Sequence, residues 1–400
     1  MEAEVRELRQ LGVSVVAGGV RRPSGRPQRL QERNLGSEVL YLQPVRILIL
    51  LRAFGLLIRR WNRVAGLLAR VLLQGKESPG LRAKALLHTY LGACYAVQLS
   101  QHRVHHIHVH HGYFGSWIAM AAAQLLGVGF SLTLHGSDLF LHGAYLDTKL
   151  QNCRFCMTIS EYNRRYILRH FAAVEAKKIL VSRLGVEIPK PYKPTWSPAT
   201  QSTAHRLRLF SVGRLHAVKD HAFLVRACAS LRDCGVDFEC AIAGEGAERR
   251  RLEKVIRELR LQQRVRLIGH ASRREMDFFY DRADVVVLTS RSEGIPLVLM
   301  EAMARGKIVV APTITGVPEL VIHDKTGFLY AAGVLKDLVT KVISLEQRIR
   351  AESRDATSDL DWVRHAARVQ VLHNFNREKN MFLFTNRFLQ LVTSEISRHP

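Results

Sequence analysis

The order of apolar and polar residues predicts strands and helices in alternation. Short runs of apolar and β-branched residues are typical of strands buried on both faces of a sheet. Such runs occupy residues 104–109, 130–134, 155–159, 178–182, 207–212, 238–243, 265–268, 283–289, 308–311 and 327–330. Between them lie segments with helical spacing of apolar residues, most regularly after residue 207, where residues 273–282 are one predicted helix. This order predicts an α/β protein with doubly wound parallel sheets.

A proline-rich segment separates two such regions. Residues 188–204 contain four prolines and predict a linker. We therefore expect an N-terminal Rossmann-like domain, a linker, a second Rossmann-like domain and C-terminal helices, at 1–187, 188–204, 205–350 and 351–400. Trp362 and Phe382 are expected to anchor those last helices.

The first 100 residues predict mainly helix. Residues 1–11 carry apolar side chains on one helical face, and 45–75 and 80–100 predict two long helices. Residues 13–17 form a β-branched run that predicts a strand, ended by two glycines. The polar, arginine-rich and proline-rich residues 20–40 predict a loop.

The chain is strongly basic, and the excess charge is uneven. The formal net charge is +24, of which +16 falls in the first 200 residues; between positions 39 and 137 the one acidic residue is Glu77. This bias indicates an anionic partner. An anionic membrane surface fits best, and a general bias towards solubility is the alternative. Nucleic acid is not expected as a partner, because no nucleic-acid-binding motif accompanies the charge.

The most apolar run, residues 44–58, has two interpretations. It is shorter than the roughly 20 residues that span a bilayer, and Arg46 and Arg52 interrupt it. It could form a buried helix or an amphipathic helix lying on a membrane. The charged first nine residues, with no apolar run behind them, do not resemble a signal peptide.

The six cysteines do not show the spacing of a disulfide framework, which in a chain of 400 residues indicates a reducing cytoplasmic compartment. Cys153 and Cys156 form a single CxxC pair. Without a second pair, they are expected to be buried small apolar side chains rather than a zinc or redox site.

The richest candidate chemistry lies in residues 290–306, SRSEGIPLVLMEAMARG. Two acids, Glu293 and Glu301, have seven residues between them and stand where a buried strand ends and a helix begins. Open α/β sheets bind ligands at that place. Pro296 fits a helix start, where free amides and the helix dipole favour an anion. Acids beside an anion site suit a ligand with both phosphates and hydroxyls, such as a nucleotide sugar.

The first strand of the second domain is followed by Gly213, Arg214 and Lys219. Glycine allows a tight turn, and the two cations could pair with a pyrophosphate. A solvated surface pair is the alternative for the cations. The turns at Arg214, Glu245 and Glu293 all follow strands, so we expect them at one edge of the sheet.

Several blocks of this second region closely resemble the donor domain of retaining family 4 glycosyltransferases, which have the GT-B fold. The blocks are SVGRLHAVKD, IAGEG, IGH, LTSRSEGIPLVLMEAMARGKIVVAP, GVPELV and TGFLY, between about residues 205 and 333. The first region adds HIHVHHG, TLHGSDL and TISEYN. The set is similar to the subgroup that builds exopolysaccharides of the colanic-acid type. In this fold, two Rossmann-like domains face each other across a cleft.

The resemblance implies a role for each matching residue. Glu301 would bind the ribose hydroxyls, and Glu293 would contact the hydroxyls of the transferred sugar. Arg214 and Lys219 would neutralise the diphosphate leaving group. The remaining donor-binding positions would be Gly213, Gly244, Glu245, Gly294, Ile295, Pro296 and Leu297, with the amides of 294–297 helping Glu293. The family needs no divalent metal, and neither a metal site nor a cofactor is expected.

His135 would sit across the cleft near the reacting sugar, beside Asp138, as an acceptor-side or catalytic group. A simple turn is the alternative for a histidine and glycine that follow a strand. His110 could face the cleft, whereas the other histidines of 105–111 are expected to alternate between core and surface.

The implied reaction transfers a hexose from a nucleotide diphosphate sugar, with retention, to a glycan or lipid-linked saccharide at the inner face of the plasma membrane. Same-face attack makes Glu293 a less favoured covalent nucleophile, and a glycosidase-like acid pair is disfavoured by the helical spacing. The alternatives are a non-catalytic homologue that binds nucleotide sugar or partners, and a nucleotide-sugar epimerase. A phosphorylase-like enzyme is disfavoured because no pyridoxal phosphate site is evident.

The resemblance also predicts a difference at the N-terminus. Family members begin with a strand and a glycine-containing loop ahead of the helix that matches residues 4–12, EVRELRQLG. A misassigned start, or a degraded copy, is expected to account for the missing first strand. In a doubly wound sheet that strand is central, so its absence would leave two sheet edges unpaired.

Overall fold

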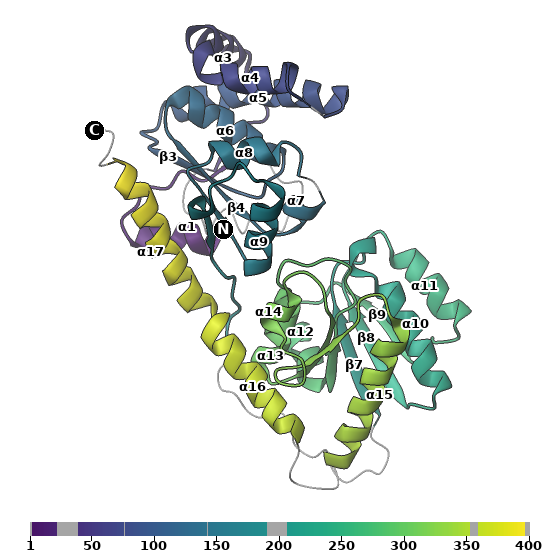
Figure 1. Ribbon diagram of the computed structural model, residues 1–400. Coiled ribbons are helices and arrows are strands. Elements are labelled where there is room, and N and C mark those ends of the chain that lie inside the picture. The colour runs from purple at the N-terminus through teal and green to yellow at the C-terminus, as the bar shows by residue number, and fades with distance from the viewer. Residues whose placement is uncertain are drawn as a thin grey trace. The chain divides into compact units, whose positions relative to one another are not determined.

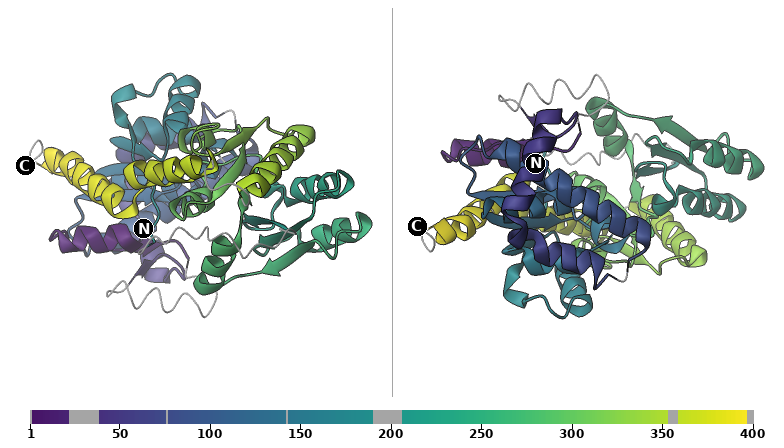
Figure 2. Two further views of the ribbon diagram at one scale, coloured as in Figure 1. Left: turned by 90° about the horizontal axis from the view of Figure 1, so that it is seen from below. Right: turned by 90° about the horizontal axis from the view of Figure 1, so that it is seen from above.

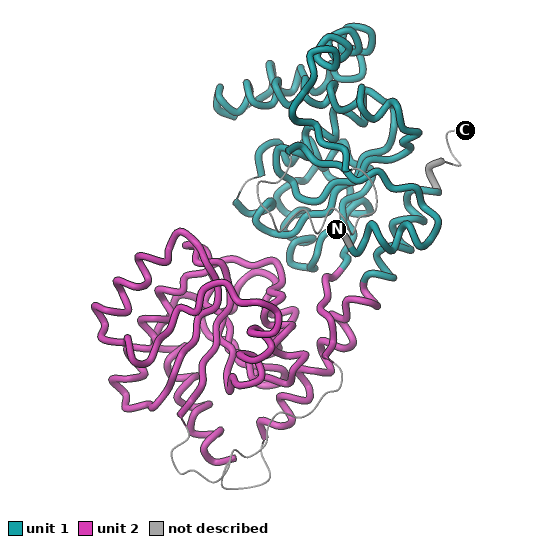
Figure 3. Tube along the Cα trace, turned by 180° about the vertical axis from the view of Figure 1, so that it is seen from behind, with its two compact units in different colours: residues 1–182, 381–400 teal, residues 183–380 magenta. Residues whose placement is uncertain are grey.

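The computed structural model describes residues 2–21, 39–75, 77–141, 143–189, 206–352 and 359–396. The expected loop at 20–40 and the linker at 188–204 lie almost wholly outside these residues. The chain divides into two compact units, coloured separately in Figure 3. Unit 1 comprises residues 1–182 and 381–400, and unit 2 comprises residues 183–380.

Unit 2 is a parallel α/β sheet with the strand order β12-β11-β10-β7-β8-β9. Its strands are β7 (Leu207–Val212), β8 (Phe238–Ala243), β9 (Val265–Gly269), β10 (Val285–Val287), β11 (Ile308–Pro312) and β12 (Phe328–Tyr330). The central strand β10 is buried throughout, as its uninterrupted valines predict.

Helices cover both faces of this sheet (Figure 1). They are α10 (His221–Asp233), α11 (Arg249–Glu258), α12 (Arg273–Arg282), α13 (Leu297–Ala304), α14 (Val317–Leu320), α15 (Leu335–Glu352) and α16 (Asp359–Asn374), with the 3-10 turn η2 (Ala217–Lys219). Val285 and Val287 pack with α10, α11 and α15. Val286 points to the other face and packs with α12, α13, α14 and α16.

Unit 1 contains a parallel sheet with the order β3-β4-β5-β6, and a separate pair formed by β1 and β2. The strands are β1 (Gly18–Gly19), β2 (Leu40–Tyr41), β3 (His106–His110), β4 (Gly129–Leu134), β5 (Phe155–Thr158) and β6 (Ile179–Val181). Among the described strands, β3 pairs with β4 only. A further strand between β1 and β3 stays a prediction of the family resemblance.

The helices of unit 1 lie on both sides of this sheet (Figures 1 and 2). They are α1 (Glu2–Gln10), α3 (Ile47–Arg59), α4 (Trp61–Leu72), α5 (Pro79–Leu99), α6 (Phe114–Leu126), α7 (Ser137–Phe140), α8 (Leu146–Asn152), α9 (Glu161–His170), the turn η1 (Ala176–Lys178) and most of α17 (Arg377–Ile396). Helices α4, α5, α6 and α8 pack on one face of β4. Leu8 of α1 and Phe384 and Phe388 of α17 pack on the other face, against Phe155 and Met157.

The predicted long helix at 45–75 is wrong, because the chain forms two helices that meet at Arg60. The backbone of Arg60 leaves the helical region, with φ −122° and ψ 27°. Its guanidinium donates to the carbonyl oxygen of Leu125, 2.6 Å away, at the end of α6. Cations are favourable at a helix C-terminus, so this contact stabilises the break.

The predicted strand at 13–17 is also wrong. These residues alternate between exposed and partly buried positions, as a strand would, but they are assigned no strand, and the short ladder is formed by Gly18 and Gly19 with β2. The β-branched composition of this segment does not reveal whether a neighbouring strand pairs with it.

The C-terminal helices divide between the units. Helices α15 and α16 pack in unit 2, whereas α17 belongs to unit 1 from Met381 onward. Trp362 and Phe382 are not anchors, since 59% and 56% of their surfaces are exposed. Phe384 and Phe388, each 8% exposed, anchor α17 instead.

The six cysteines are free, and all but Cys234 are buried. Cys153 and Cys156 are thus buried small side chains, as expected. Among the described helices, none combines the length and the apolarity needed to cross a bilayer.

Candidate functional site

The strand ends of unit 2 converge at the carboxyl edge of its sheet. The amide of Gly213 donates to Ala243 (3.0 Å), and the amide of Gly244 donates to Gly269 (2.8 Å). Gly244 has φ +141°, and a Cβ there would overlap the carbonyl oxygen of Gly213. Only glycine fits this position. The loops after β7, β8 and β9 therefore pack backbone to backbone.

Lys219 and Glu293 form an ion pair at this edge, between the loops after β7 and β10. Lys219 ends η2, and the next residue, Asp220, has φ +44°. Its carboxylate accepts from the amide of Phe223 (3.3 Å) at the start of α10 and pairs with Arg291 (2.8 Å). A non-glycine residue in the left-handed region is held there by such contacts. The turn thus aims Lys219 at the loop that carries Glu293.

The backbone of Glu293 is fixed from the loop after β11. The hydroxyl of Thr315 donates to the carbonyl oxygen of Glu293, and the amide of Glu293 donates to that hydroxyl (3.3 Å). Thr315 has φ +38°, which is unusual for a β-branched residue. A Cβ at the next residue, Gly316, would overlap the carbonyl oxygen of Gly294. Two loops therefore hold Glu293 in place.

Helix α13 begins at Leu297, with Pro296 as its N-cap residue. The expected contribution of amides from 294 to 297 needs a correction, because proline has no N–H group. Among the described residues, the amides of Gly294, Leu297 and Val298 donate no hydrogen bond. These groups remain available, at the positive end of the helix, for an anion.

Glu301 lies in the second turn of α13 and is held by a tyrosine. The hydroxyl of Tyr280 donates to its Oε2 (2.8 Å) and contacts the carbonyl oxygen of Val298 (3.2 Å). The guanidinium of Arg305 lies over the Tyr280 ring, 4.9 Å from its centroid, and donates to the carbonyl oxygen of Glu301 (3.0 Å). In the described residues, Oε1 of Glu301 has no hydrogen-bond partner.

Arg214 and Glu245 lie on the surface of the same edge. Arg214 is exposed, and its guanidinium makes no hydrogen bond or ion pair with the described part of the chain. Glu245 pairs with Arg249 (2.6 Å), and its carbonyl oxygen accepts from the amide of Leu215 (2.9 Å). Within the described chain, Arg214 is thus an unpaired cation next to Gly213. The carboxylate of Glu245 is already paired with Arg249, the first residue of α11.

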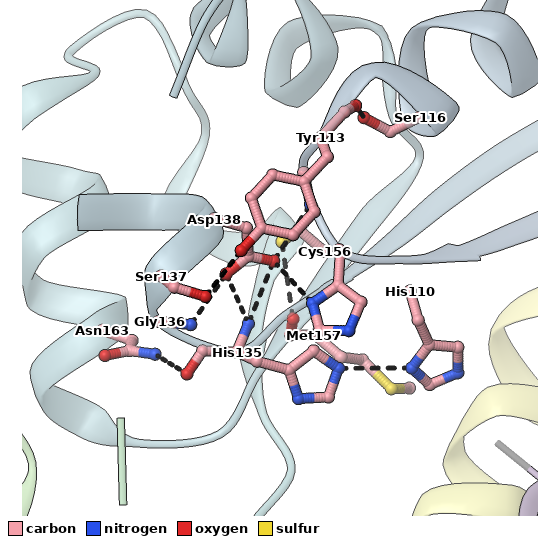
Figure 4. Close-up of polar contacts among 12 residues, drawn as sticks. His110, Tyr113, Ser116, His135, Gly136, Ser137, Asp138, Cys156, Met157 and Asn163 are labelled. Atoms are coloured by element: carbon pink, nitrogen blue, oxygen red, sulfur yellow. Dashed lines mark hydrogen bonds and ion pairs between the residues drawn. The ribbon is translucent and has the colours of Figure 1, made fainter. Parts of the chain in front are cut away.

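A second cluster lies in unit 1, at the carboxyl ends of β3 and β4 (Figure 4). Asp138 has no exposed surface and accepts from the amides of Gly112 (3.0 Å), His135 (3.1 Å) and Gly136 (2.7 Å). Burial alone would raise its pKa, but hydrogen bonds from His111 and from two of these amides lower that pKa to about 2. Asp138 therefore holds the two loops together, and its carboxylate is not exposed to an acceptor.

His135 and His110 are side by side in this cluster. Nε2 of His135 lies 3.3 Å from Nδ1 of His110, whose Nε2 pairs with Glu4 (2.9 Å). Burial, with the nearby charges of His111 and His110, lowers the pKa of His135 to about 4. His135 is therefore a neutral imidazole near pH 7, able to donate or accept a hydrogen bond.

The histidines of β3 do not alternate between core and surface as expected. His106, His108 and His110 lie on one face of the strand, opposite Ile107. His106 and His108 contact the hydroxyl of Ser131, each at 2.7 Å, on β4. Burial lowers the pKa of His106 to about 4 and also lowers that of His108 well below its usual value. The strand has a polar face that α17 covers.

The comparisons with known proteins find similarity to glycosyltransferases. Residues 193–358 match the family of glycosyl transferases group 1. Escherichia coli WcaL, named for colanic acid biosynthesis, is 37% identical over 212 residues, covering 50% of this chain and 48% of WcaL. The amylovoran biosynthesis glycosyltransferase AmsK of Erwinia amylovora is 33% identical over 209 residues, with the same shares. The chain thus spans about half the length of these curated relatives.

Solved structures resemble nearly the whole chain. A glycosyltransferase from Rickettsia africae has a TM-score of 0.68 at 18% identity, covering 98% of this chain and 94% of its own. Anabaena HepE in complex with UDP-glucose has a TM-score of 0.66 at 18% identity, covering 99% and 96%. The chain has the GT-B fold that these glycosyltransferases share.

The unit 2 edge combines cations, free amides and acids within one set of loops. Lys219, Arg214 and the start of α13 can bind anionic groups, while Glu293 and Glu301 can accept from hydroxyls. Among the described residues, no group of three His, Cys, Asp or Glu side chains has a metal-binding arrangement. The expectation of metal-independent chemistry stays a prediction.

Sequence reasoning missed Tyr280 and Thr315, which position the two predicted acids. Tyr280 is the last apolar position of a helix predicted correctly at 273–282, and nothing in its spacing reveals a neighbour 21 residues away. Thr315 precedes a glycine after a buried strand, as turn residues often do. That pattern predicts a turn but not the side chain's partner.

Proposed function

We propose that this protein transfers a hexose from a nucleotide diphosphate sugar to a glycan or lipid-linked saccharide, with retention, in the synthesis of a cell-surface polysaccharide. The observation that carries the proposal is the ion pair between Lys219 and Glu293 beside the unpaired Arg214. The match to glycosyl transferases group 1 and the UDP-glucose bound by HepE support a nucleotide sugar as donor.

Lys219 and Arg214 would stabilise the departing diphosphate. As the bond from the anomeric carbon to the phosphate oxygen breaks, negative charge grows on the phosphate, and nearby cations stabilise it. An acceptor hydroxyl attacks the same carbon and passes its proton to the leaving phosphate, so the new glycosidic bond forms without an external base. The free amides at the start of α13 add dipolar stabilisation.

Glu293 would contact the hydroxyls of the transferred sugar. Its pairing with Lys219 has a consequence for donor binding, because the lysine charge is already engaged by an acid. When the donor binds, the ammonium group of Lys219 would interact in part with the diphosphate. One carboxylate oxygen of Glu293 would then be available to the sugar. A carboxylate held by a cation is also a weaker nucleophile, which supports a contact role over a covalent one.

Glu301 would accept hydrogen bonds from the ribose. Tyr280 occupies Oε2, while Oε1 has no partner within the described chain. Two neighbouring ribose hydroxyls could donate to the carboxylate together. One would donate to Oε1 and the other to Oε2, which also accepts from Tyr280. The arrangement fixes the carboxylate before the nucleotide arrives.

In unit 1, neutral His135 would contact the sugar or acceptor, with His110 beside it. Asp138 would act indirectly, by holding the loop that carries His135. The names of WcaL and AmsK support an exopolysaccharide as the product, and the basic first half of the chain supports a location at the inner face of the plasma membrane.

The test is a panel of nucleotide sugars, with release of the nucleoside diphosphate as the readout. Lys219→Ala or Arg214→Ala should lower turnover by a factor on the order of 10²–10³, since each removes a charge next to the leaving group. Lys254→Ala and Arg251→Ala are matched controls, because both cations are exposed and pair with acids on α11 or at its start. Wild-type turnover in the Lys219 and Arg214 variants would reject the proposal.

Calorimetry with the nucleoside diphosphates separates a catalyst from a non-catalytic homologue. The proposal expects binding together with turnover of at least one donor. Nucleotide binding without release from any donor or acceptor pair would identify a binding protein of the same fold.

A further inference from the structure

The largest group of exposed apolar side chains in the described residues lies on α3 and at the start of α4. Ile47 is 75% exposed, Leu51 67% and Ile58 62%. Leu48, Phe54 and Trp61 are also more than half exposed. Scattered exposed apolar residues are ordinary, but a contiguous patch of this kind marks an interaction surface.

These side chains form a stripe along one side of α3. Residues at positions 47, 51, 54 and 58 follow the spacing of a single helical face. The opposite side of α3 faces the protein, since Ala53 is fully buried and the hydroxyl of Tyr90 in α5 donates to the carbonyl oxygen of Leu50 (2.8 Å). Helix α3 is therefore held by its inner face, and its apolar outer face has no cover from the described chain.

The charge around the stripe is positive. Arg46, Arg52 and Arg59 are exposed next to it. The first acid after α3 in the sequence, Glu77, is already paired with Arg70 (2.9 Å). Long arginine side chains can keep their charge at the level of lipid headgroups while their stems lie along an apolar layer. An apolar stripe flanked by unopposed arginines is complementary to an anionic lipid surface.

The length of the helix fixes how it could meet a bilayer. Thirteen residues span roughly 20 Å, less than the hydrocarbon thickness of about 30 Å. The end of α3 is also tied to the protein, because Arg60 donates to the carbonyl oxygen of Leu125 near the end of α6. A helix that is short and fixed along one side can lie in the interface but cannot cross it.

We propose that the outer face of α3, with Trp61 at the start of α4, inserts into the interface of an anionic membrane. The same segment, drawn in dark blue, forms a layer with α5 at one end of unit 1 (Figure 2). Of the two interpretations of residues 44–58, the buried helix is excluded by the exposure of the stripe. Vesicle binding does not require sugar transfer, so this proposal and the proposed function can fail separately.

The test is co-sedimentation of the full-length protein with vesicles of phosphatidylcholine, alone or mixed with phosphatidylglycerol. We expect binding to the mixed vesicles and weaker binding when salt is raised, because salt screens the arginines. Replacing Leu51, Phe54 and Ile58 together by Gln should weaken binding by about 100-fold, since three apolar side chains no longer enter the interface. Trp61 fluorescence should shift to shorter wavelength on binding, and Trp61→Phe should reduce that shift.

The matched control replaces Phe278, Trp362 and Phe382 by Gln. These side chains are as exposed as the stripe but lie outside α3 and α4. This variant should bind vesicles within about twofold of wild type. Circular dichroism of both variants checks folding, which exposed positions should leave unchanged.

Three outcomes would overturn the proposal. The first is no binding of the wild-type protein to anionic vesicles at about 0.15 M salt. The second is equal binding by the stripe variant and the control variant. The third is a wild-type dimer in light scattering that the stripe variant converts to a monomer, since that would assign the face to a second copy of this chain.

Discussion

In both units, acidic residues lie beyond the carboxyl ends of parallel strands, but their carboxylates have different hydrogen-bond partners. Asp138 in unit 1 accepts from three main-chain amides and has no exposed surface. Glu293 in unit 2 pairs with one flexible lysine, and Glu301 accepts from one tyrosine hydroxyl. Main-chain amides cannot move away from a carboxylate without moving the loop, whereas a lysine side chain can.

This difference separates a structural acid from a ligand-binding one. A carboxylate has room for about four hydrogen bonds, and in Asp138 three backbone donors and His111 occupy that capacity. Glu301 keeps one oxygen without a partner in the described chain. The position after a strand therefore does not determine the role, but the number of fixed donors around the carboxylate does.

The histidines show the same contrast between the units. In unit 1, burial lowers the pKa values of His106 and His135 to about 4 and also lowers that of His108 well below its usual value. In the described part of unit 2, His221 has a pKa lowered to about 4, again chiefly by burial. Unit 1 therefore holds more neutral imidazoles that resist protonation.

The largest expected effect is on the acid stability of unit 1. The unfolded pKa of histidine is about 6.5, so the stability from each buried neutral ring is complete above that pH. It decreases as the pH falls from 6.5 to 4, because the unfolded chain takes up protons that the folded one excludes. Over that range, each of His106 and His135 should lower the free energy of unfolding of unit 1 by about 3 kcal/mol at most. Hydrogen exchange resolved by residue should show unit 1 losing protection before unit 2.

The variant His106→Gln sharpens this prediction. Glutamine keeps a polar contact for Ser131 but does not titrate, so the loss of protection in unit 1 should be shallower. His323→Gln, at an exposed position in unit 2, is the matched control. Equal loss of protection in both units as the pH falls would contradict the comparison.

Removing the fixed acid should affect folding more than binding. Asp138→Ala leaves three buried amides without an acceptor, which should destabilise unit 1 by about 3 kcal/mol or more. Urea denaturation measures this loss, and nucleotide affinity measured by calorimetry on the folded protein should stay near wild type. Asp138→Asn keeps the size and one acceptor and should recover part of the stability. A variant as stable as wild type would show that Asp138 is not a structural acid.

The smallest expected effect comes from the tyrosine that holds Glu301. Tyr280→Phe removes one hydrogen bond of 2.8 Å but leaves the ring packed under Arg305. The donor KM should rise about fivefold, since one net hydrogen bond contributes about 1 kcal/mol, while kcat changes little. A tyrosine hydroxyl at the neighbouring position, introduced by Phe279→Tyr, would not restore the contact with Glu301. This variant therefore checks that the place of the hydroxyl matters. An unchanged KM would show that Glu301 does not need this orientation.

The regular parts of unit 2 could be predicted from the sequence. Strands β7 and β8 and helix α12 have the predicted bounds, because their apolar runs and end signals are strong. The placing of Gly213, Gly244 and Glu293 at one edge also followed, since parallel strands share their carboxyl ends.

Other features depend on contacts between distant residues and could not be predicted. The break at Arg60 comes from a carbonyl 65 residues away, and the orientation of Glu301 comes from a neighbouring helix. The role of Asp138 depends on main-chain amides, which every residue except proline has and which no sequence pattern reveals. These contacts are determined by how helices and strands pack against one another, and the spacing of residues within one helix or strand does not reveal them.

The division of α17 between the units has a consequence for biosynthesis. Phe155 and Met157 leave the ribosome early, but the rings that cover them, Phe384 and Phe388, are made roughly 230 residues later. At about 5–20 residues per second, this leaves the apolar face of β5 without its cover for on the order of 10–40 s. Unit 1, although made first, is therefore completed last, and an apolar face of its sheet lacks part of its cover during that interval.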